Sequence, residues 1–132
     1  MPSVGEVYWA EMQFEDEPDS KVRPVVVLGE DEEEGTMLVL IMELTSKGPK
    51  ARIQGKGTFR LRRFDTLKVP IVQSVQIGMK RFSYAKVHRT LVIEADGLDR
   101  KNYIGTLSLE DIANIQHSYA LYKLDQIGQQ LS

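Results

Sequence analysis

The sequence predicts a mainly β protein, a small antiparallel β-barrel followed by one amphipathic C-terminal α-helix. Three observations favour this fold class. Short apolar and β-branched segments follow one another as far as Glu94. The connections between them are too short for helical crossovers, which indicates antiparallel pairing. Helical spacing of apolar residues begins only after Ser108. A chain of 132 residues is expected to form a single domain, residues 1–132.

The expected strands follow from runs of apolar, aromatic and β-branched residues bounded by turn-forming residues. The second run, VRPVVVLG, is continuously apolar and ends at Gly29, which is typical of a strand buried on both faces. The acidic segment EDEEEGT after it is expected to be a solvated turn, and SKGPKARIQGKG a loop or irregular hairpin. The predicted strands are residues 4–14, 22–29, 37–45, 58–64, 69–78 and 87–93.

The last third of the chain predicts one helix. Ser108 is suited to cap its first turn, and Glu110 and Asp111 favour the positive end of the helix dipole. Gly128 is expected to end the helix. Apolar residues recur near helical spacing at Leu109, Ile112, Ala113, Tyr119, Ala120, Leu124 and Ile127.

Composition excludes several classes of site. The chain has no cysteine, which excludes disulfides and thiolate zinc sites. His88 and His117 lie far apart in the sequence, so we expect no metal site and no cofactor. No apolar run is long enough to span a membrane, and the N-terminus lacks a signal-peptide pattern. We therefore expect a cytoplasmic protein.

Charge is unevenly distributed along the chain. The net charge is only −2, but residues 47–63 contain seven Lys or Arg and no Asp or Glu. Residues 15–19 and 30–34 are densely acidic. This pattern predicts one positive face on an acidic protein; the alternative is a set of separately solvated loops.

The order of these features resembles the MazF/PemK toxins of bacterial toxin–antitoxin modules. The resemblance covers roughly residues 4–124 and rests on the successive motifs GEVYWAEM, VRPVVVL, ELTS, SVQIG and IGTLSLEDIANIQ. The most specific pieces are Gly5 with Trp9, Arg23 with Pro24, Thr45 with Ser46, and the segment from Gly105 to Ser108. The resemblance implies the SH3-like fold shared with CcdB. It also implies a metal-independent endoribonuclease that cleaves single-stranded RNA, inhibits translation and growth, acts as a homodimer and is silenced by an antitoxin.

The resemblance also implies site residues. Arg23 matches the arginine that acts on the scissile phosphate, and Thr45 matches the threonine that holds it, with Ser46 beside it. The basic segment predicts a rim that follows RNA phosphates. The predicted RNA-binding residues are Lys47, Lys50, Arg52, Arg60 and Ser74. Ser74 stands about where several relatives carry a carboxylate, which leaves the general base unassigned.

The residues themselves support part of this assignment. Arginine suits phosphate because its planar fork provides two parallel donors and stays charged. Pro24 favours an extended backbone at Arg23 and so restricts its approach. Adjacent antiparallel strands should bring Arg23 near Thr45. The alternatives are an ion pair between Arg23 and the acidic loop, at Glu17 or Asp19, and ordinary turn chemistry at Thr45.

Three aromatic residues, Trp9, Phe59 and Tyr84, are candidates for stacking on unpaired bases. For Trp9 we expect burial in the core or at a dimer seam instead. Two functions without cleavage remain open: a CcdB-like barrel that binds a protein, and a degenerate relative that binds nucleic acid or an antitoxin. An Arg23 side chain held in an internal ion pair would favour these alternatives.

Overall fold

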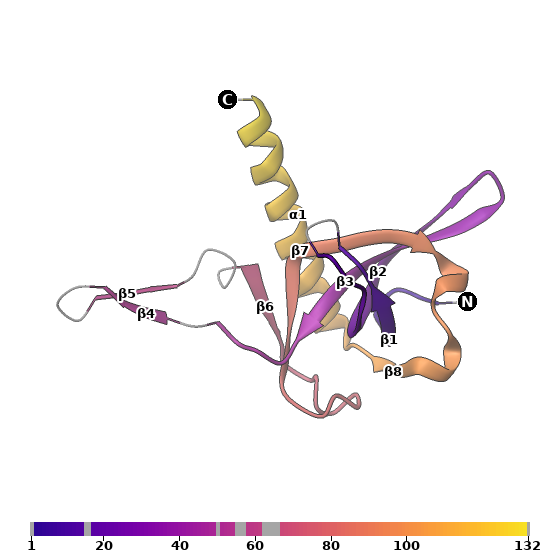
Figure 1. The fold of residues 1–132 in the computed structure, drawn as a ribbon, viewed down its shortest axis with the longest axis horizontal. Helices are drawn as coiled ribbons and strands as arrows, with labels where there is room; N and C mark the ends of the chain where they lie inside the picture. Colours follow the sequence, from indigo (N-terminus) through magenta and orange to yellow (C-terminus); the bar gives the residue numbers. More distant parts are fainter. Residues whose placement is uncertain (1, 15–16, 50, 55–57, 62–66, 132) are drawn as a thin grey trace.

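One antiparallel sheet of six strands forms the centre of the protein, in a computed structural model that describes residues 2–14, 17–49, 51–54, 58–61 and 67–131. The strand order is β6-β7-β3-β2-β1-β8 (Figure 1). The strands are β1 (Glu6–Met12), β2 (Lys21–Glu33), β3 (Thr36–Thr45), β6 (Lys68–Ile71), β7 (Ser83–Glu94) and β8 (Tyr103–Thr106). The mainly β fold is therefore confirmed. Because β6 and β8 are edges, hydrogen bonds between the described strands do not close the sheet into a complete barrel.

The remaining elements surround this sheet. Strands β4 (Ala51–Gln54) and β5 (Thr58–Leu61) form a separate hairpin that extends away from the body (Figure 1). Two short 3-10 turns, η2 (Ala95–Gly97) and η3 (Arg100–Asn102), connect β7 to β8. Helix α1 (Leu109–Leu131) packs against β6 and β7, and its C-terminal half projects beyond the sheet (Figure 1).

Strand β2 is buried on both faces, as its continuous apolar run predicts. Val26 and Leu28 pack in one cluster with the start of the helix, whereas Val25 and Val27 pack in a second cluster on the other face of the sheet. This alternation follows from the two-residue period of a strand. Because of this alternation, neighbouring residues of β2, such as Arg23 and Pro24, face opposite sides of the sheet.

The acidic segment after Gly29 is strand rather than turn, so that prediction is wrong. β2 continues to Glu33 and pairs with β3 as far as Glu33 opposite Thr36. The turn is confined to Glu34 and Gly35, both with positive φ, of 50° and 82°, which suits a two-residue hairpin turn. The acidic side chains of this hairpin are exposed, so its pairing leaves them in water.

The predicted strand 69–78 is also wrong in its second half, because β6 ends at Ile71. The backbone N–H groups of Val72 and Gln73 donate to the buried carboxylate of Asp111, each at 3.0 Å, instead of to a neighbouring strand. Residues 72–78 form turns that approach β8 closely: a Cβ at Gly105 would lie 1.9 Å from the carbonyl oxygen of Ile77.

The helix begins as predicted but ends later. The Ser108 hydroxyl accepts a hydrogen bond from the Asp111 backbone N–H at 3.1 Å, which is the expected cap. Gly128 does not end the helix, which continues to Leu131, because Gly128 does not take the left-handed conformation that a glycine stop requires.

Candidate nucleic-acid interface

A pocket of about 390 Å³ lies where β1, β2 and β3 meet the turns after β6. It combines an exposed indole, three hydroxyl-bearing residues and two cations. Its walls come from five regions of the chain: Trp9, Pro24, Leu44, Thr45, Ser46, Gly78, Met79, Lys80, Arg81, Ser83 and Ile104. This mixture of an aromatic face, hydroxyl groups and positive charge is suited to a nucleotide.

Thr45 and Ser46 reach this pocket from the end of β3. The Thr45 hydroxyl accepts a hydrogen bond from the Lys47 backbone N–H at 3.1 Å. This is the bond of a threonine to the backbone of its own turn, which the sequence analysis named as the alternative role of Thr45. The hydroxyl keeps its proton for donation to a ligand, because it acts here as an acceptor. Ser46 is exposed.

Arg23 lies beside this pocket but is not among the residues that line it. Pro24 lines the pocket, and the alternation of β2 turns Arg23 to the other face of the sheet. The pairing of β2 with β3 ends at Val25 opposite Glu43; beyond it, Arg23 pairs with Ala10 of β1 and Thr45 pairs with Tyr84 of β7.

The Arg23 guanidinium is held by two carboxylates. It donates to both oxygens of Glu17, at 3.1 and 2.9 Å, and lies 3.2 Å from a carboxylate oxygen of Glu43. The Arg23 side chain is only 9% exposed. The sequence left an Arg23–Glu17 ion pair as an alternative, and the structure contains that pair.

A second arginine shares the same carboxylates. Arg89 on β7 donates to Glu17 and approaches Glu43 at 3.4 Å. The Phe14 ring lies under both guanidinium groups, 5.2 Å from Arg23 and 4.2 Å from Arg89. We call Arg23, Arg89, Glu17 and Glu43 the arginine–carboxylate cluster. Sequence reasoning missed Arg89, because only the sheet order brings β7 to within one strand of β2.

Electrostatics within the cluster are those of tight ion pairs. The hydrogen bonds that Arg23 donates to Glu17 hold the pKa of Glu17 below its usual value. The same bonds raise the pKa of Arg23. Lys86 adds a third cation, 3.5 Å from Glu43. Lys21 is a fourth cation, 3.9 Å from Glu17. The cations therefore outnumber the two carboxylates, and loss of the Glu17 contact would leave a site suited to an anion.

His88 lies on the same strand as Arg89. Burial, together with the neighbouring positive charges of Lys86 and Arg89, lowers the pKa of His88 to about 4. The imidazole is therefore neutral at pH 7.

The predicted RNA-binding residues are scattered. Lys47 is exposed next to the pocket. Ser74 is fully buried, and its hydroxyl accepts a hydrogen bond from the Ser83 backbone N–H at 3.0 Å. Lys50 lies outside the described residues. Arg52 and Arg60 are paired positions of β4 and β5, and their side chains lie outside the described part of the structure.

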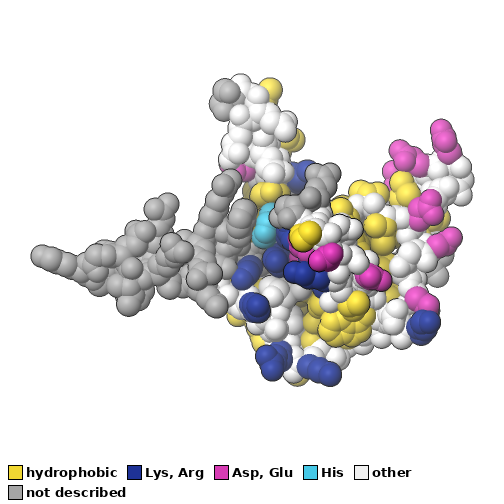
Figure 2. Space-filling model, viewed as in Figure 1, with side chains coloured by type: hydrophobic (Ala, Val, Ile, Leu, Met, Phe, Trp, Pro, Cys, Tyr) yellow, Lys and Arg dark blue, Asp and Glu magenta, His cyan; other side chains and the backbone are white. Residues whose placement is uncertain are grey.

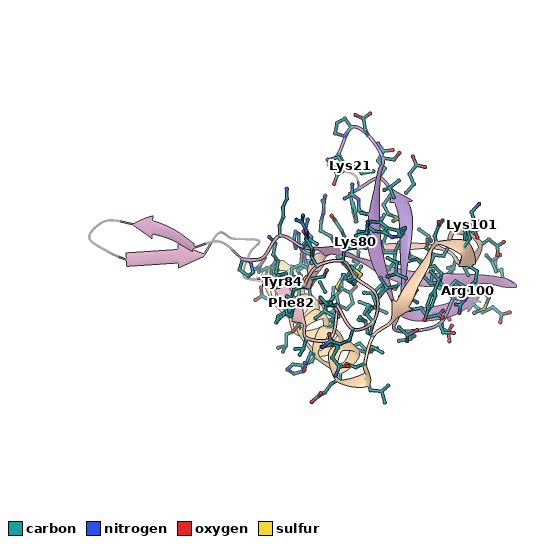
Figure 3. The ribbon with its side chains drawn as sticks, turned by 90° about the horizontal axis from the view of Figure 1, so that it is seen from below. Lys21, Lys80, Phe82, Tyr84, Arg100 and Lys101 are labelled. Carbon is teal, nitrogen blue, oxygen red and sulfur yellow. The ribbon has the colours of Figure 1, made fainter. Side chains whose placement is uncertain are left out.

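Positive and negative side chains are concentrated on different parts of the surface. Figure 2 shows Lys and Arg gathered on one side of the body and Asp and Glu along the β2–β3 hairpin. Figure 3 shows Lys80, Phe82 and Tyr84 where the β4–β5 hairpin extends from the body, with Arg100 and Lys101 on the opposite side. Trp9 is 45% exposed, so its expected burial within the chain is wrong.

No group of three metal-ligating side chains occurs among the described residues. Across the same part of the chain, no helix has the length and apolarity needed to cross a membrane.

Comparison with protein families identifies the family of this chain. The family model of PemK-like, MazF-like toxins of type II toxin–antitoxin systems matches residues 3–121. A search of curated proteins found no matching relative. The matched segment contains the pocket, the arginine–carboxylate cluster and most of the helix.

Proposed function

Because this chain belongs to the PemK-like, MazF-like toxins of type II toxin–antitoxin systems, we propose that it is a metal-independent endoribonuclease acting on single-stranded RNA. The observation that carries the proposal is the pocket of Trp9, Thr45, Ser46, Lys80 and Arg81, which also includes Pro24, the residue after Arg23 on β2. In this proposal RNA lies along the pocket, with a base on the exposed indole and phosphates near the cations.

Cleavage without a metal uses the 2′-hydroxyl next to the scissile phosphate. Its oxygen forms a bond to phosphorus while the bond to the 5′-oxygen breaks, and a 2′,3′-cyclic phosphate forms. The 2′-hydroxyl loses a proton and the 5′-oxygen gains one. Arg23 is assigned to the charge that develops on the phosphate oxygens, which requires its side chain to leave Glu17 and turn toward the pocket that Thr45 and Ser46 line. Thr45 and Ser46 are assigned as further hydrogen-bond donors.

The Arg23–Glu17 contact must open for this chemistry. A phosphate offers the same paired oxygen acceptors as a carboxylate, and it can therefore replace Glu17 on the guanidinium. Once separated from Arg23, the Glu17 carboxylate loses the main cause of its lowered pKa and becomes a better proton acceptor. Glu17 is therefore the candidate general base in this proposal, a role that the sequence left unassigned.

The wider role follows from the family. We propose that the protein acts in the cytoplasm as a homodimer, inhibits translation and growth by cleaving mRNA, and is silenced by a cognate antitoxin bound at the RNA site. The charge pattern supports an acidic antitoxin segment, because the pocket presents Lys80 and Arg81.

The second candidate is binding of RNA or a protein without cleavage. The closed arginine–carboxylate cluster favours it, because Arg23 is not available to a ligand while Glu17 holds both of its terminal nitrogens.

One experiment separates the two candidates. Purified protein is incubated with a mixed-sequence single-stranded RNA in EDTA, beside Arg23→Ala, Arg23→Lys and Lys101→Ala. Lys101 is the control because its side chain is 78% exposed on the far side of the molecule (Figure 3). Cleavage by the wild type and Lys101→Ala, with loss in both Arg23 variants, supports the nuclease. Absence of cleavage with retained RNA binding supports the second candidate. Circular dichroism melts identify any variant that does not fold.

A further inference from the structure

Helix α1 leaves one end of the sheet uncovered. Beside the helix, Leu28 packs in one cluster with Ile112 and Ile115, and its carbonyl accepts a hydrogen bond from the Gln116 side chain at 3.4 Å. From Gly29 to Glu33, β2 continues with β3 as a hairpin that projects from the body (Figure 1). The face of this hairpin that continues the Leu28 face therefore begins where the contact with the helix ends.

This face has an apolar floor. Leu40 lies opposite Val92, and Leu38 lies opposite Glu94, so these side chains of β3 and β7 point to the same side of the sheet. Leu38 and Leu40 are half-buried, whereas Val92 is 63% exposed. Gly29 lies opposite Leu40 and has no side chain to cover it. A groove of about 380 Å³ is open here, lined by Gly29, Glu30, Asp31, Glu33, Leu38, Val39, Leu40 and Val92.

Carboxylates surround the apolar floor. Asp31 lies opposite Leu38 and Glu33 lies opposite Thr36, on the same side of the sheet as Leu40. A second hollow of about 430 Å³ shares Glu33 and Leu38 with the groove and is also lined by Glu34, Thr36 and Glu94. Among the described residues, no ion pair joins any of these carboxylates to a Lys or Arg. Their negative charge therefore repels phosphate and attracts a cationic partner.

We propose that this face binds a Lys- or Arg-rich segment of a partner protein that also carries apolar side chains. We call it the acidic groove, formed by Asp31, Glu33, Leu38, Leu40, Val92 and Glu94. Its length from Gly29 to Glu34 is about 17 Å at about 3.4 Å per residue, which matches a short extended segment. Apolar side chains of that segment cover the floor, while its cations meet the carboxylates on either side.

The acidic groove and the RNA pocket lie at opposite ends of β3. Leu38 is near the first residue of the strand, and Thr45 is its last. The pocket presents Lys80 and Arg81, so the two sites select partners of opposite charge. The proposal therefore does not depend on whether the protein cleaves RNA.

A fluorescein-labelled synthetic peptide that alternates Lys with Leu tests the proposal directly. Fluorescence anisotropy should give a Kd in the micromolar range for the full-length protein. A peptide with Glu in place of each Lys should not bind. A peptide that alternates Lys with Ser keeps the charges without the apolar side chains, and should bind at least about tenfold more weakly. Failure of the Lys–Leu peptide to bind below about 100 μM would overturn the proposal.

Substitutions locate the binding surface. Asp31→Asn/Glu33→Gln removes two carboxylates from the acidic groove and should weaken peptide binding at least about tenfold. The matched control, Glu32→Gln/Asp96→Asn, removes the same charge outside both hollows and should stay within about twofold. Val92→Thr keeps the branched shape but adds a hydroxyl to the floor, and should weaken binding at least about threefold. All of these side chains are exposed, so each variant should remain folded. Equal weakening by the two double variants would attribute binding to net charge alone and refute the groove.

Two competition experiments decide between occupants. Spermine is a small polycation without apolar side chains, and a peptide of residues 47–63 presents the basic segment that a second copy of this chain would bring. Both should displace the Lys–Leu peptide more weakly than its unlabelled form does. Spermine that competes equally well would make the groove a general polycation site. Tighter binding of the 47–63 peptide would assign the groove to a second copy, and either result would overturn the proposed partner.

Discussion

Arg23 and Arg89, which lie on strands β2 and β7, bind the same two carboxylates, Glu17 and Glu43. Glu43 lies on β3, the strand between them, whereas Glu17 lies in the loop that precedes β2. One carboxylate is therefore fixed by the sheet, and the other is supplied by a loop. A loop can move without disturbing strand pairing, so Glu17 is the member of the cluster that a phosphate can replace.

Replacing Glu17 by glutamine should strengthen RNA binding and weaken cleavage. The amide keeps the shape of the side chain but lacks the charge that competes with phosphate for Arg23 and Arg89. We expect about tenfold tighter binding of an uncleavable 2′-deoxy oligonucleotide, measured by fluorescence anisotropy. Cleavage of the matching RNA should fall, because the proposed base is removed. Asp19→Asn, which removes a charge from the same loop, is the control and should leave affinity within about twofold. Equal or weaker binding by Glu17→Gln would contradict the proposed competition.

Salt dependence should identify the cations that contact RNA. Each phosphate contact contributes about −0.7 to the slope of log affinity against log salt concentration for a single strand. Lys80→Ala and Arg81→Ala should each make that slope shallower by about 0.7. Lys101→Ala, on the opposite side of the molecule in Figure 3, should leave the slope unchanged. A titration of binding between low and moderate salt provides the slope, and identical slopes in all variants would remove Lys80 and Arg81 from the interface.

Asp111 should be one of the most sensitive positions for stability. Its buried carboxylate accepts the backbone N–H groups of Val72 and Gln73. Asp111→Asn loses the charge and one of the two acceptors, and should lower the free energy of unfolding by about 2–3 kcal/mol. Urea denaturation measures this change. Glu110→Gln, exposed at the neighbouring position, should stay within about 0.5 kcal/mol of wild type. A similar result for both variants would show that the Asp111 contacts add no net stability.

His88 should make stability fall on mild acidification. Its pKa is lowered to about 4 in the folded protein from the usual 6.5, so the unfolded chain binds the proton first as pH falls. Stability contributed by neutral His88 is present above pH 6.5 and is lost progressively toward pH 4. Between about pH 6.5 and 5 the loss should be at most about 1.5 kcal/mol, because solvent partly screens a ring that is not fully buried.

The measurement is urea unfolding at several pH values in that window. His88→Gln should flatten the curve relative to wild type. His117→Gln, exposed on the helix, is the matched control and should keep the wild-type curve. A wild-type slope in His88→Gln would assign the pH dependence to other groups.

Short sequence patterns predicted the elements of the fold that depend on interactions between residues close together in the sequence. The apolar run 25–28 and the capping Ser108 each act within a few residues, and both predictions are confirmed. The errors have distant causes. The predicted strand 69–78 is shortened by Asp111, about 40 residues later in the sequence, and the strand character of Glu30–Glu33 comes from its ladder with β3.

In the candidate site too, the residues identified from the sequence depend on local pattern, and the residues that were missed depend on distant contacts. Sequence order identified Thr45 and Ser46 at a strand end, and both line the pocket. The side chain of Arg23 pairs with Glu17, which sequence reasoning named only as an alternative. Arg89, Lys80 and Arg81 were missed as site residues because β7 and the turns before it reach the site through sheet order, which no short motif encodes.

The two hydrogen bonds from Val72 and Gln73 to Asp111 connect the helix to the chain after β6. These bonds join the first turn of the helix to the start of the segment that supplies Lys80 and Arg81 to the pocket, so we expect the two segments to open together. A molecule that orders the pocket will also slow amide exchange at the helix start, and a substitution at the helix start will alter which ligands the pocket accepts. Natural variants that change preference should therefore carry paired changes in these two segments.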